Sequence, residues 1–151
     1  MKGNYTMIDS ITMWHSRARP NPNEREMNVQ LGCHLEEIAE MLEVLDSDIP
    51  ETRNALSVLQ LLTSRLADQL KLGTTNVYID NDVEFLDALA DQVVTAVGVG
   101  YCAGLKITGA IEEVNTSNWS KFDSDGKPIL NEAGKITKGP NYRKPDLSKF
   151  V

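Results

Sequence analysis

The sequence predicts an all-α protein built as a single domain. Apolar residues recur every three or four positions through most of the first 121 residues, which is the spacing that keeps them on one face of a helix. Proline, glycine and short polar stretches separate these periodic segments. A chain of 151 residues is long enough to bury a core, so residues 1–151 are expected to form one domain.

Five helices are expected in chain order, at about residues 6–17, 24–46, 50–72, 81–104 and 107–121. Pro20 and Pro22 separate the first two helices, and Pro50 lies in the first turn of the third. Gly73 follows the end of the third helix. The core faces of the second and third helices are expected to consist of Leu31, Leu35, Ile38, Leu42 and Leu45, and of Leu56, Leu59, Leu62, Leu66 and Leu70.

The last part of the chain, residues 122–151, differs in composition and is expected to form a C-terminal arm. Residues 125–129 and 133–136 have the pattern of two short strands, joined by a turn at residues 131–134. The expected architecture is therefore a bundle of four or five helices followed by a short hairpin or an extended arm.

The net charge of −7 is unevenly distributed along the chain. Residues 36–113 contain 15 acidic and 4 basic residues, whereas residues 114–151 contain 4 acidic and 7 basic residues. The acidic body argues against nucleic-acid binding through the phosphates. The basic tail suits a small polyanion held from two sides, although a lysine-rich end that serves only solubility explains the charges equally well.

Cysteine and hydropathy patterns indicate a cytoplasmic protein with no membrane partner. Cys33 and Cys102 have no Cys-x-x-Cys or Cys/His spacing, which argues against a zinc site or a disulfide framework. No apolar run approaches the ~20 residues that a membrane helix needs. The first five residues lack the apolar core of a signal peptide.

Two clusters of carboxylates carry most of the functional information. The first consists of Glu36, Glu37 and Glu40, with Glu43 behind it, on the expected helix at residues 24–46. At 100° per residue, Glu36 and Glu37 lie within about 60° of Glu40, so the three share one face. Taken alone, this face has the pattern of an ordinary solvated acidic stripe.

The second cluster lies on a helix that the sequence predicts to be buried. Glu84, Asp87 and Asp91 share one face, whereas the helix from residue 85 to residue 103 is otherwise apolar almost all round. Buried carboxylates must be paired, hydrogen-bonded or bound to a metal ion. The two explanations are metal ligation and pairing with Arg53 or Arg65 of the third helix.

Together the two clusters predict a divalent metal site. Four or more carboxylates in a small space repel one another unless cations lie between them. All-oxygen ligands suit Mg²⁺ or Mn²⁺, and the sequence has no Glu-x-x-His pair of the kind found in di-iron bundles. Such sites activate water against phosphate esters and anhydrides, which predicts phosphate chemistry.

Other residues leave a functional and a structural explanation open. The glycines at positions 98, 100 and 104 allow close approach of a ligand or tight helix packing, and packing is favoured. Trp14 beside His15 is as compatible with base stacking as with core packing. The polar run from Asn115 to Lys121 is either a helix C-terminus or a phosphate-contacting cluster.

The order of these motifs resembles that of the all-α nucleoside triphosphate pyrophosphohydrolases, which include MazG-like, dimeric dUTPase-like and HisE-like proteins. The motifs that carry the resemblance are Glu36-Glu37-x-x-Glu40, Asp87-Ala-Leu-Ala-Asp91 with Gly98, Ser117-Asn118-x-Ser120-Lys121, and Lys138-Gly139-Pro140-Asn141-Tyr142. The resemblance covers nearly the whole chain from Trp14 onward, and the chain looks like a MazG/HisE-like subgroup common in phages.

The resemblance implies a set of ligands and substrate contacts. Glu37 and Glu40 match metal ligands and catalytic carboxylates, and Asp91 matches the aspartate of a second motif whose glutamate is replaced here by Ala88. Asp87 or Glu84 would have to substitute for that glutamate. The implied metal ligands are Glu36, Glu37, Glu40, Asp87 and Asp91. The implied substrate contacts are Trp14, His15, Gln30 and Asn81 around the base, together with Ile11, then Asn118 and Lys121 at the triphosphate, and also Lys138 and Tyr142.

The implied reaction converts a nucleoside triphosphate and water to a nucleoside monophosphate and pyrophosphate. Mg²⁺ is the implied cofactor, with Mn²⁺ as a substitute and two or more ions per site. By analogy with members that resemble dGTP/GTP pyrophosphatases, we expect a purine deoxynucleotide, with dGTP or GTP first, in the host cytoplasm if a phage encodes the chain. Family members are homodimers or homotetramers. The alternatives are a non-catalytic nucleotide- or metal-sensing helical oligomer and a purely structural one.

Overall fold

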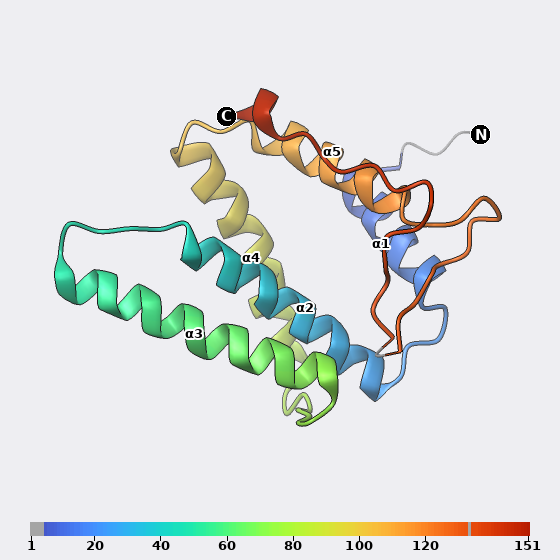
Figure 1. Ribbon diagram of the computed structural model, residues 1–151, viewed down its shortest axis with the longest axis horizontal. Coiled ribbons are helices and arrows are strands. Elements are labelled where there is room, and N and C mark those ends of the chain that lie inside the picture. Colours follow the sequence, from blue (N-terminus) through green and yellow to red (C-terminus); the bar gives the residue numbers. More distant parts are fainter. Residues whose placement is uncertain (1–4, 133) are drawn as a thin grey trace. The chain divides into compact units, whose positions relative to one another are not determined.

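The computed structural model describes residues 5–132 and 134–151, and its regular elements are all helical (Figure 1). In chain order they are α1 (Met7–Ala18), α2 (Glu24–Glu43), α3 (Pro50–Leu72), α4 (Asp82–Cys102), α5 (Ile107–Trp119) and the short 3₁₀ helix η1 (Ser148–Phe150). The predicted all-α class is therefore confirmed.

Local capping explains why the helix ends fall close to the positions expected from the sequence. Thr6 and Asp9 form a capping box at the start of α1, and Asn23 and Glu26 form another at the start of α2. Gly73 ends α3 in the left-handed conformation, with φ of 75°, which glycine adopts without steric cost. These signals lie within a few residues of each end, so they can be recognised in the sequence.

The chain divides into two compact units. One, called here the hairpin unit, consists of Pro22–Tyr78 and Leu130–Lys135 and contains α2 and α3. The other, called here the three-helix unit, consists of the chain up to Asn21, Ile79–Ile129 and Ile136–Val151, and contains α1, α4, α5 and η1. The segment 130–135 therefore belongs to the hairpin unit, although the residues on either side of it belong to the three-helix unit.

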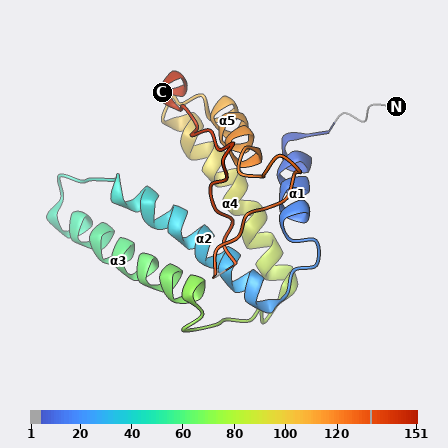
Figure 2. The same ribbon diagram turned by 45° about the vertical axis from the view of Figure 1, so that its right-hand side comes forward.

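In the hairpin unit, α2 and α3 lie side by side and antiparallel (Figures 1 and 2). The buried seam between them contains small residues as well as larger ones: Val29, Gly32 and Ala39 on α2, and Ala67 and Leu70 on α3. A Cβ added to Gly32 would lie 2.8 Å from the carbonyl oxygen of Ala67. The two backbones approach closely because position 32 has no side chain.

The expected leucine faces are only partly buried. Leu70 is fully buried, but Leu59, Leu62 and Leu66 are 53%, 57% and 39% exposed, and Leu45 is 51% exposed. The expectation of a leucine core is therefore wrong for these four positions, because the small-residue seam next to them makes the contact between α2 and α3.

The core of the three-helix unit forms around Trp14. Trp14 and Ala18 of α1 pack with Phe122 and Ile136, and Trp119 of α5 packs against them. Asn115 and Trp119 each donate a hydrogen bond to the Ser10 hydroxyl, at 2.9 and 3.2 Å. These contacts join α1 to α5.

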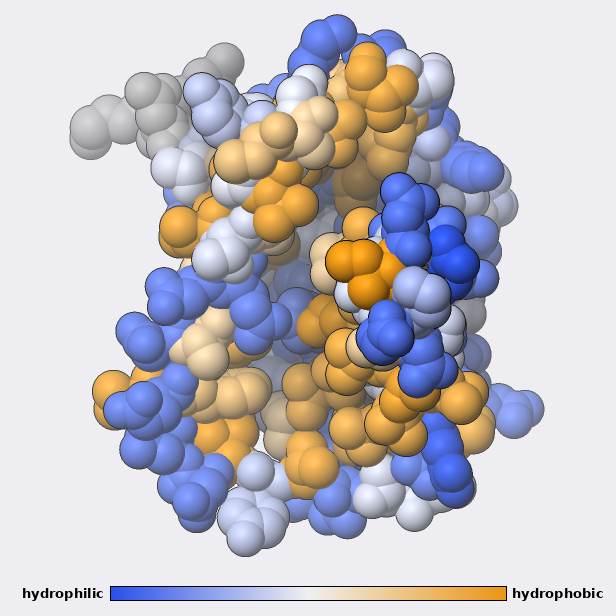
Figure 3. Space-filling view, turned by 90° about the vertical axis from the view of Figure 1, so that its left-hand side faces the viewer, coloured by the Kyte–Doolittle hydropathy of each residue, from blue (hydrophilic) through white to orange (hydrophobic). Residues whose placement is uncertain are grey.

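Helix α4 is the main departure from the expected packing. Within the three-helix unit it packs against α5, where the side chain of Ile107 lies against Gly100, and Gly100 is its one buried residue among those described. Figure 3 shows hydrophobic side chains over much of the visible surface. The exposed apolar residues of α4 are Val83, Leu86, Val93, Val94, Val97, Val99 and Tyr101. The predicted burial of this helix is not found within the three-helix unit, because α5 contacts it only near its C-terminal end.

The length and apolar composition of α4 are also those of a helix that could cross a membrane. Composition alone is weak support for a membrane helix, and the carboxylates of Asp87 and Asp91 disfavour a bilayer environment.

The glycines on and after this helix have separate roles. Gly100 allows close packing, Gly98 has no neighbour within 4 Å of the place that a Cβ would occupy, and Gly104 turns the chain with φ of 76°.

The C-terminal arm is extended, and its described residues contain no regular strand. The two expected strands are replaced by isolated backbone hydrogen bonds, from Asn131 N–H to the Lys135 carbonyl and from Thr137 N–H to the Ile129 carbonyl. The N–H of Lys127, which is next in this register, donates to the Asp123 side chain instead. Ala133, part of the expected second strand and turn, lies outside the described residues.

The chain ends against the start of α5. The Lys106 N–H donates to the Phe150 carbonyl at 2.9 Å, and the Phe150 ring occupies the space where a side chain at Gly109 would lie. Glu113 of α5 accepts hydrogen bonds from Arg143 and from the Asp146 N–H. The end of the arm, residues 143–151, is thus fixed to one helix.

Candidate functional site

The three glutamates of the first cluster have different surroundings on α2. Glu36 is partly buried, and its two carboxylate oxygens accept hydrogen bonds from Lys71 of α3 and Lys135 of the arm, each at 2.8 Å. Lys71 also binds Asp68 at 3.0 Å. Glu37 and Glu40 are exposed. The cluster therefore separates into one lysine-bound glutamate and two that face solvent.

The electrostatics of Glu36 follow from this geometry. Burial raises its pKa, but the hydrogen bonds and positive charges of Lys135 and Lys71 lower it by more, so the net shift is downward. Burial lowers the pKa of Lys71, but Glu36 and Asp68 raise it by more. Both net shifts favour the charged forms, the carboxylate of Glu36 and the ammonium group of Lys71.

Glu37 and Glu40 are the exposed members of the cluster. They are three residues apart on a continuous helix, so their carboxylates lie on one face about one turn apart. Two carboxylates on one helix face suit Mg²⁺, which keeps several waters and is commonly bound through one or two carboxylates together with substrate phosphates.

Asp87 and Asp91 form a similar pair on α4, in the three-helix unit. They lie one turn apart and are exposed, and Glu84 precedes them on the same face. In the part of the chain that the structure describes, neither aspartate makes an ion pair. Arg53, one of the two arginines considered as partners, instead binds Asp46 at 2.8 Å.

The predicted five-carboxylate centre is not assembled within either unit. Glu36, Glu37 and Glu40 belong to the hairpin unit, whereas Asp87 and Asp91 belong to the three-helix unit. Among the described residues, no group of three or more histidine, cysteine, aspartate or glutamate side chains is placed to hold a metal ion. What each unit offers is a pair of exposed carboxylates, and a pair fits the limited protein ligation that Mg²⁺ requires.

The tryptophan and histidine of the expected base pocket pack in the three-helix core. Trp14 is only 8% exposed, its indole N–H donates to the Asn118 carbonyl at 2.8 Å, and its ring contacts His15 edge-on. Burial lowers the pKa of His15, and the positive charge of Arg19 lowers it further. Core packing is therefore the role that the structure gives Trp14, and its ring has little free surface for a base.

Several predicted triphosphate contacts gather beside this core. Lys121 Nζ lies 5.9 Å from the centre of the Trp14 ring, and Lys138 Nζ lies 5.0 Å from the centre of the Tyr142 ring. A Cβ at Gly139 would lie 2.7 Å from the Lys121 carbonyl oxygen, so the loop at residues 138–142 rests directly on the end of α5. We call Asn118, Lys121, Lys138 and Tyr142 the basic cluster.

The remaining predicted contacts have other surroundings. The Asn81 side chain caps α4 by accepting from the Val83 and Glu84 N–H groups, and Gln30 is half-buried on α2. The hydroxyls of the polar run are also used in the fold, because Ser117 donates to the Arg143 carbonyl and the Arg143 N–H donates to Ser120. For these two serines the structural explanation is confirmed.

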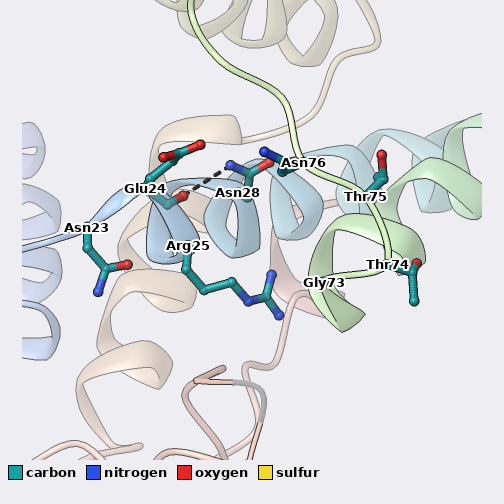
Figure 4. Close-up of a pocket in the computed structure, with 8 residues that line it drawn as sticks. All are labelled: Asn23, Glu24, Arg25, Asn28, Gly73, Thr74, Thr75 and Asn76. Carbon is teal, nitrogen blue, oxygen red and sulfur yellow. Dashed lines mark hydrogen bonds between the residues drawn. The ribbon is translucent and has the colours of Figure 1, made fainter.

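The structure also shows a pocket that sequence reasoning missed. It has a volume of about 570 Å³ and lies between the start of α2 and the loop after α3 (Figure 4). Its lining residues are Asn23, Glu24, Arg25, Asn28, Gly73, Thr74, Thr75 and Asn76. Buried Asn28 donates to the carbonyls of Glu24 and Val77 and accepts from the Val77 N–H. An asparagine next to Val29 on the buried side of α2 is the sequence signal that could have indicated this loop contact.

Comparison with protein-family models, with curated proteins and with solved structures finds no match to this chain.

Proposed function

We propose that the protein is a Mg²⁺-dependent nucleoside triphosphate pyrophosphohydrolase that releases a nucleoside monophosphate and pyrophosphate. The observation that carries the proposal is that Glu37 and Glu40 on α2 are exposed to solvent. Glu36, the third glutamate of the motif, binds two lysines instead. The second exposed pair, Asp87 and Asp91, and the basic cluster support it.

The carboxylate pairs supply the acidic half of such a site. Glu37 and Glu40 would bind Mg²⁺ on the hairpin unit. Asp87 and Asp91 would bind Mg²⁺ on the three-helix unit. Bound Mg²⁺ or Mn²⁺ supplies charge neutralisation at the phosphates and lowers the pKa of a water ligand. Glu37 or Glu40 is the base that we propose to orient the attacking water.

The basic cluster supplies the opposite charge. Lys121 Nζ and Lys138 Nζ lie over the rings of Trp14 and Tyr142, and ammonium groups form charge-assisted hydrogen bonds with phosphate oxygens. In this proposal they stabilise the charge that develops on the departing pyrophosphate. The preference for a purine deoxynucleotide, with dGTP or GTP first, rests on the family resemblance.

The proposal includes a homodimer or homotetramer. Helix α4 in the three-helix unit and the leucines of α3 in the hairpin unit each present apolar side chains that their own unit leaves uncovered. A second copy of the chain is the partner that we propose to cover some of these side chains.

The direct test is incubation of the protein with each of the common NTPs and dNTPs in the presence of Mg²⁺, followed by identification of the products. We expect the monophosphate and pyrophosphate in equal amounts, with the highest rate for dGTP or GTP. Glu40→Gln and Asp91→Asn should each lower kcat by at least about 100-fold, the scale of a lost acid–base or metal-bound group. Glu43→Gln, a neutralisation on the same helix but outside the pair, is the matched control and should retain activity.

A non-catalytic nucleotide or metal sensor is the alternative. It is favoured by the replacement of the second-motif glutamate by Ala88. Mg²⁺-dependent nucleotide binding without turnover would establish it in place of the enzyme.

A further inference from the structure

Both oxygens of Glu36 are already bound to cations. The Lys71 and Lys135 ammonium groups each lie 2.8 Å from a different oxygen, a distance typical of a charge-assisted hydrogen bond. Lys71 is held on its other side by Asp68 and its side chain is only 15% exposed. A metal ion at Glu36 would share a carboxylate whose charge two ammonium groups already offset, which weakens the attraction of this carboxylate for a further cation.

Lys135 brings a distant part of the chain to this point. It lies 99 positions after Glu36 and ends the segment 130–135, which belongs to the hairpin unit although its neighbours in sequence do not. Within the segment, the Lys135 N–H donates to the Asn131 side chain and the Asn131 N–H donates to the Lys135 carbonyl. These two hydrogen bonds connect Asn131 to the residue that binds Glu36.

We propose that Glu36 is a positioning residue that fastens the 130–135 segment to α2 through Lys135, and that it is not a metal ligand. The three glutamates of the motif Glu36-Glu37-x-x-Glu40 then have two different roles on one helix. Glu36 turns toward α3 and the segment, and Glu37 and Glu40 face solvent for the cation. The metal half of this inference rests on the proposed function, whereas the fastening of the segment does not.

The test combines amide hydrogen exchange of peptides covering residues 130–137 with calorimetric titration of Mn²⁺ into the full chain. The variants are Glu36→Gln, Lys135→Met, the double variant, and Glu40→Gln. Lys127→Met removes another lysine from the C-terminal part of the chain, one with no ion pair among the described residues, and is the matched control.

We expect exchange in the segment to be about threefold or more faster in Glu36→Gln and in Lys135→Met, as for the loss of a partly buried ion pair. The double variant should exchange no faster than the single ones, because both changes break the same contact. Mn²⁺ affinity should stay within about twofold of the parent in Glu36→Gln and fall at least about tenfold in Glu40→Gln, which loses a ligand.

Unchanged exchange in Glu36→Gln, or additive effects in the double variant, would overturn the fastening role. A tenfold loss of Mn²⁺ affinity in Glu36→Gln would show that Glu36 is a ligand and overturn the other half of the inference. If the parent chain binds no Mn²⁺, the metal assignment of the proposed function fails, and the exchange result alone then decides whether Glu36 fastens the segment.

Discussion

At the scale of single residues, residues of the same type have different roles, which depend on the element that packs against them. Glu36 and Glu40 are four positions apart on α2, yet lysines bind the first and the second faces solvent. Gly32 and Gly98 are both inside helices, but a backbone carbonyl adjoins Gly32 and nothing lies within 4 Å of the place a Cβ would occupy at Gly98. These differences depend on the opposing element and are absent from the helical pattern itself.

The two glycines give a matched pair for stability measurements. Gly32→Ala should destabilise the hairpin unit by about 1–3 kcal/mol, since its Cβ would meet the Ala67 carbonyl oxygen, which is backbone and cannot swing away. Gly98→Ala should be neutral or stabilise by up to about 1 kcal/mol, because alanine favours the helix. Urea unfolding of both variants measures this, and equal effects would contradict the close packing at Gly32.

Glu113 predicts a dependence of stability on pH. The hydrogen bond from Arg143 is the largest cause and lowers the pKa of Glu113, and the hydrogen bond from the Asp146 N–H lowers it further. Together they outweigh burial, which raises this pKa. A lowered folded-state pKa gives stabilisation that is complete above the pKa of the unfolded chain and is lost as pH falls through the folded-state pKa. Glu113→Gln should therefore melt below the parent at pH 7, with the difference shrinking below about pH 4. A difference that stays constant from pH 7 to pH 3 would exclude this origin.

At the scale of elements, the sequence predicts where helices begin and end better than what they contact. Asn23 with Glu26, Pro50 and Gly73 are local signals, and the observed ends of α2 and α3 follow them. The burial expected for α4 is not found within the three-helix unit, because an apolar pattern indicates that a surface needs a partner but does not identify that partner. The lysine at position 135 that binds Glu36 could not be found from spacing on α2, since that contact depends on how the arm folds back.

The contact between η1 and α5 can be tested as an element. In Gly109→Ala the new Cβ would overlap the Phe150 ring, so we expect the ring and η1 to leave α5. The Lys106 amide, which donates to the Phe150 carbonyl, should then exchange faster with solvent. In a Phe150→Ala background the same glycine change should have little further effect, and an equal effect in both backgrounds would place the disturbance elsewhere.

At the scale of the whole molecule, the exposed apolar surface of α4 is the feature that the three-helix unit alone does not explain. Val94 is 68% exposed in the middle of α4, and Leu86 is exposed to the same extent two turns earlier. If a second copy covers this helix, Val94→Lys should shift the sedimentation of the protein toward the monomer, because it places a charge in an apolar contact. Asn54→Lys, which adds the same charge at an exposed polar position of α3, should leave the assembly unchanged. A monomeric parent would contradict the proposed homo-oligomer.

The proposed chemistry rests on the exposed carboxylate pair of α2 in the hairpin unit, and on the carboxylate pair of α4 and the basic cluster in the three-helix unit. The measurement that tests it most directly is ³¹P NMR of dGTP incubated with the protein and Mg²⁺. We predict that the three triphosphate signals are replaced by those of dGMP and pyrophosphate, and that Glu40→Gln prevents the change. Release of orthophosphate, or an unaltered spectrum with dGTP and with every other nucleotide tried, would contradict the assignment.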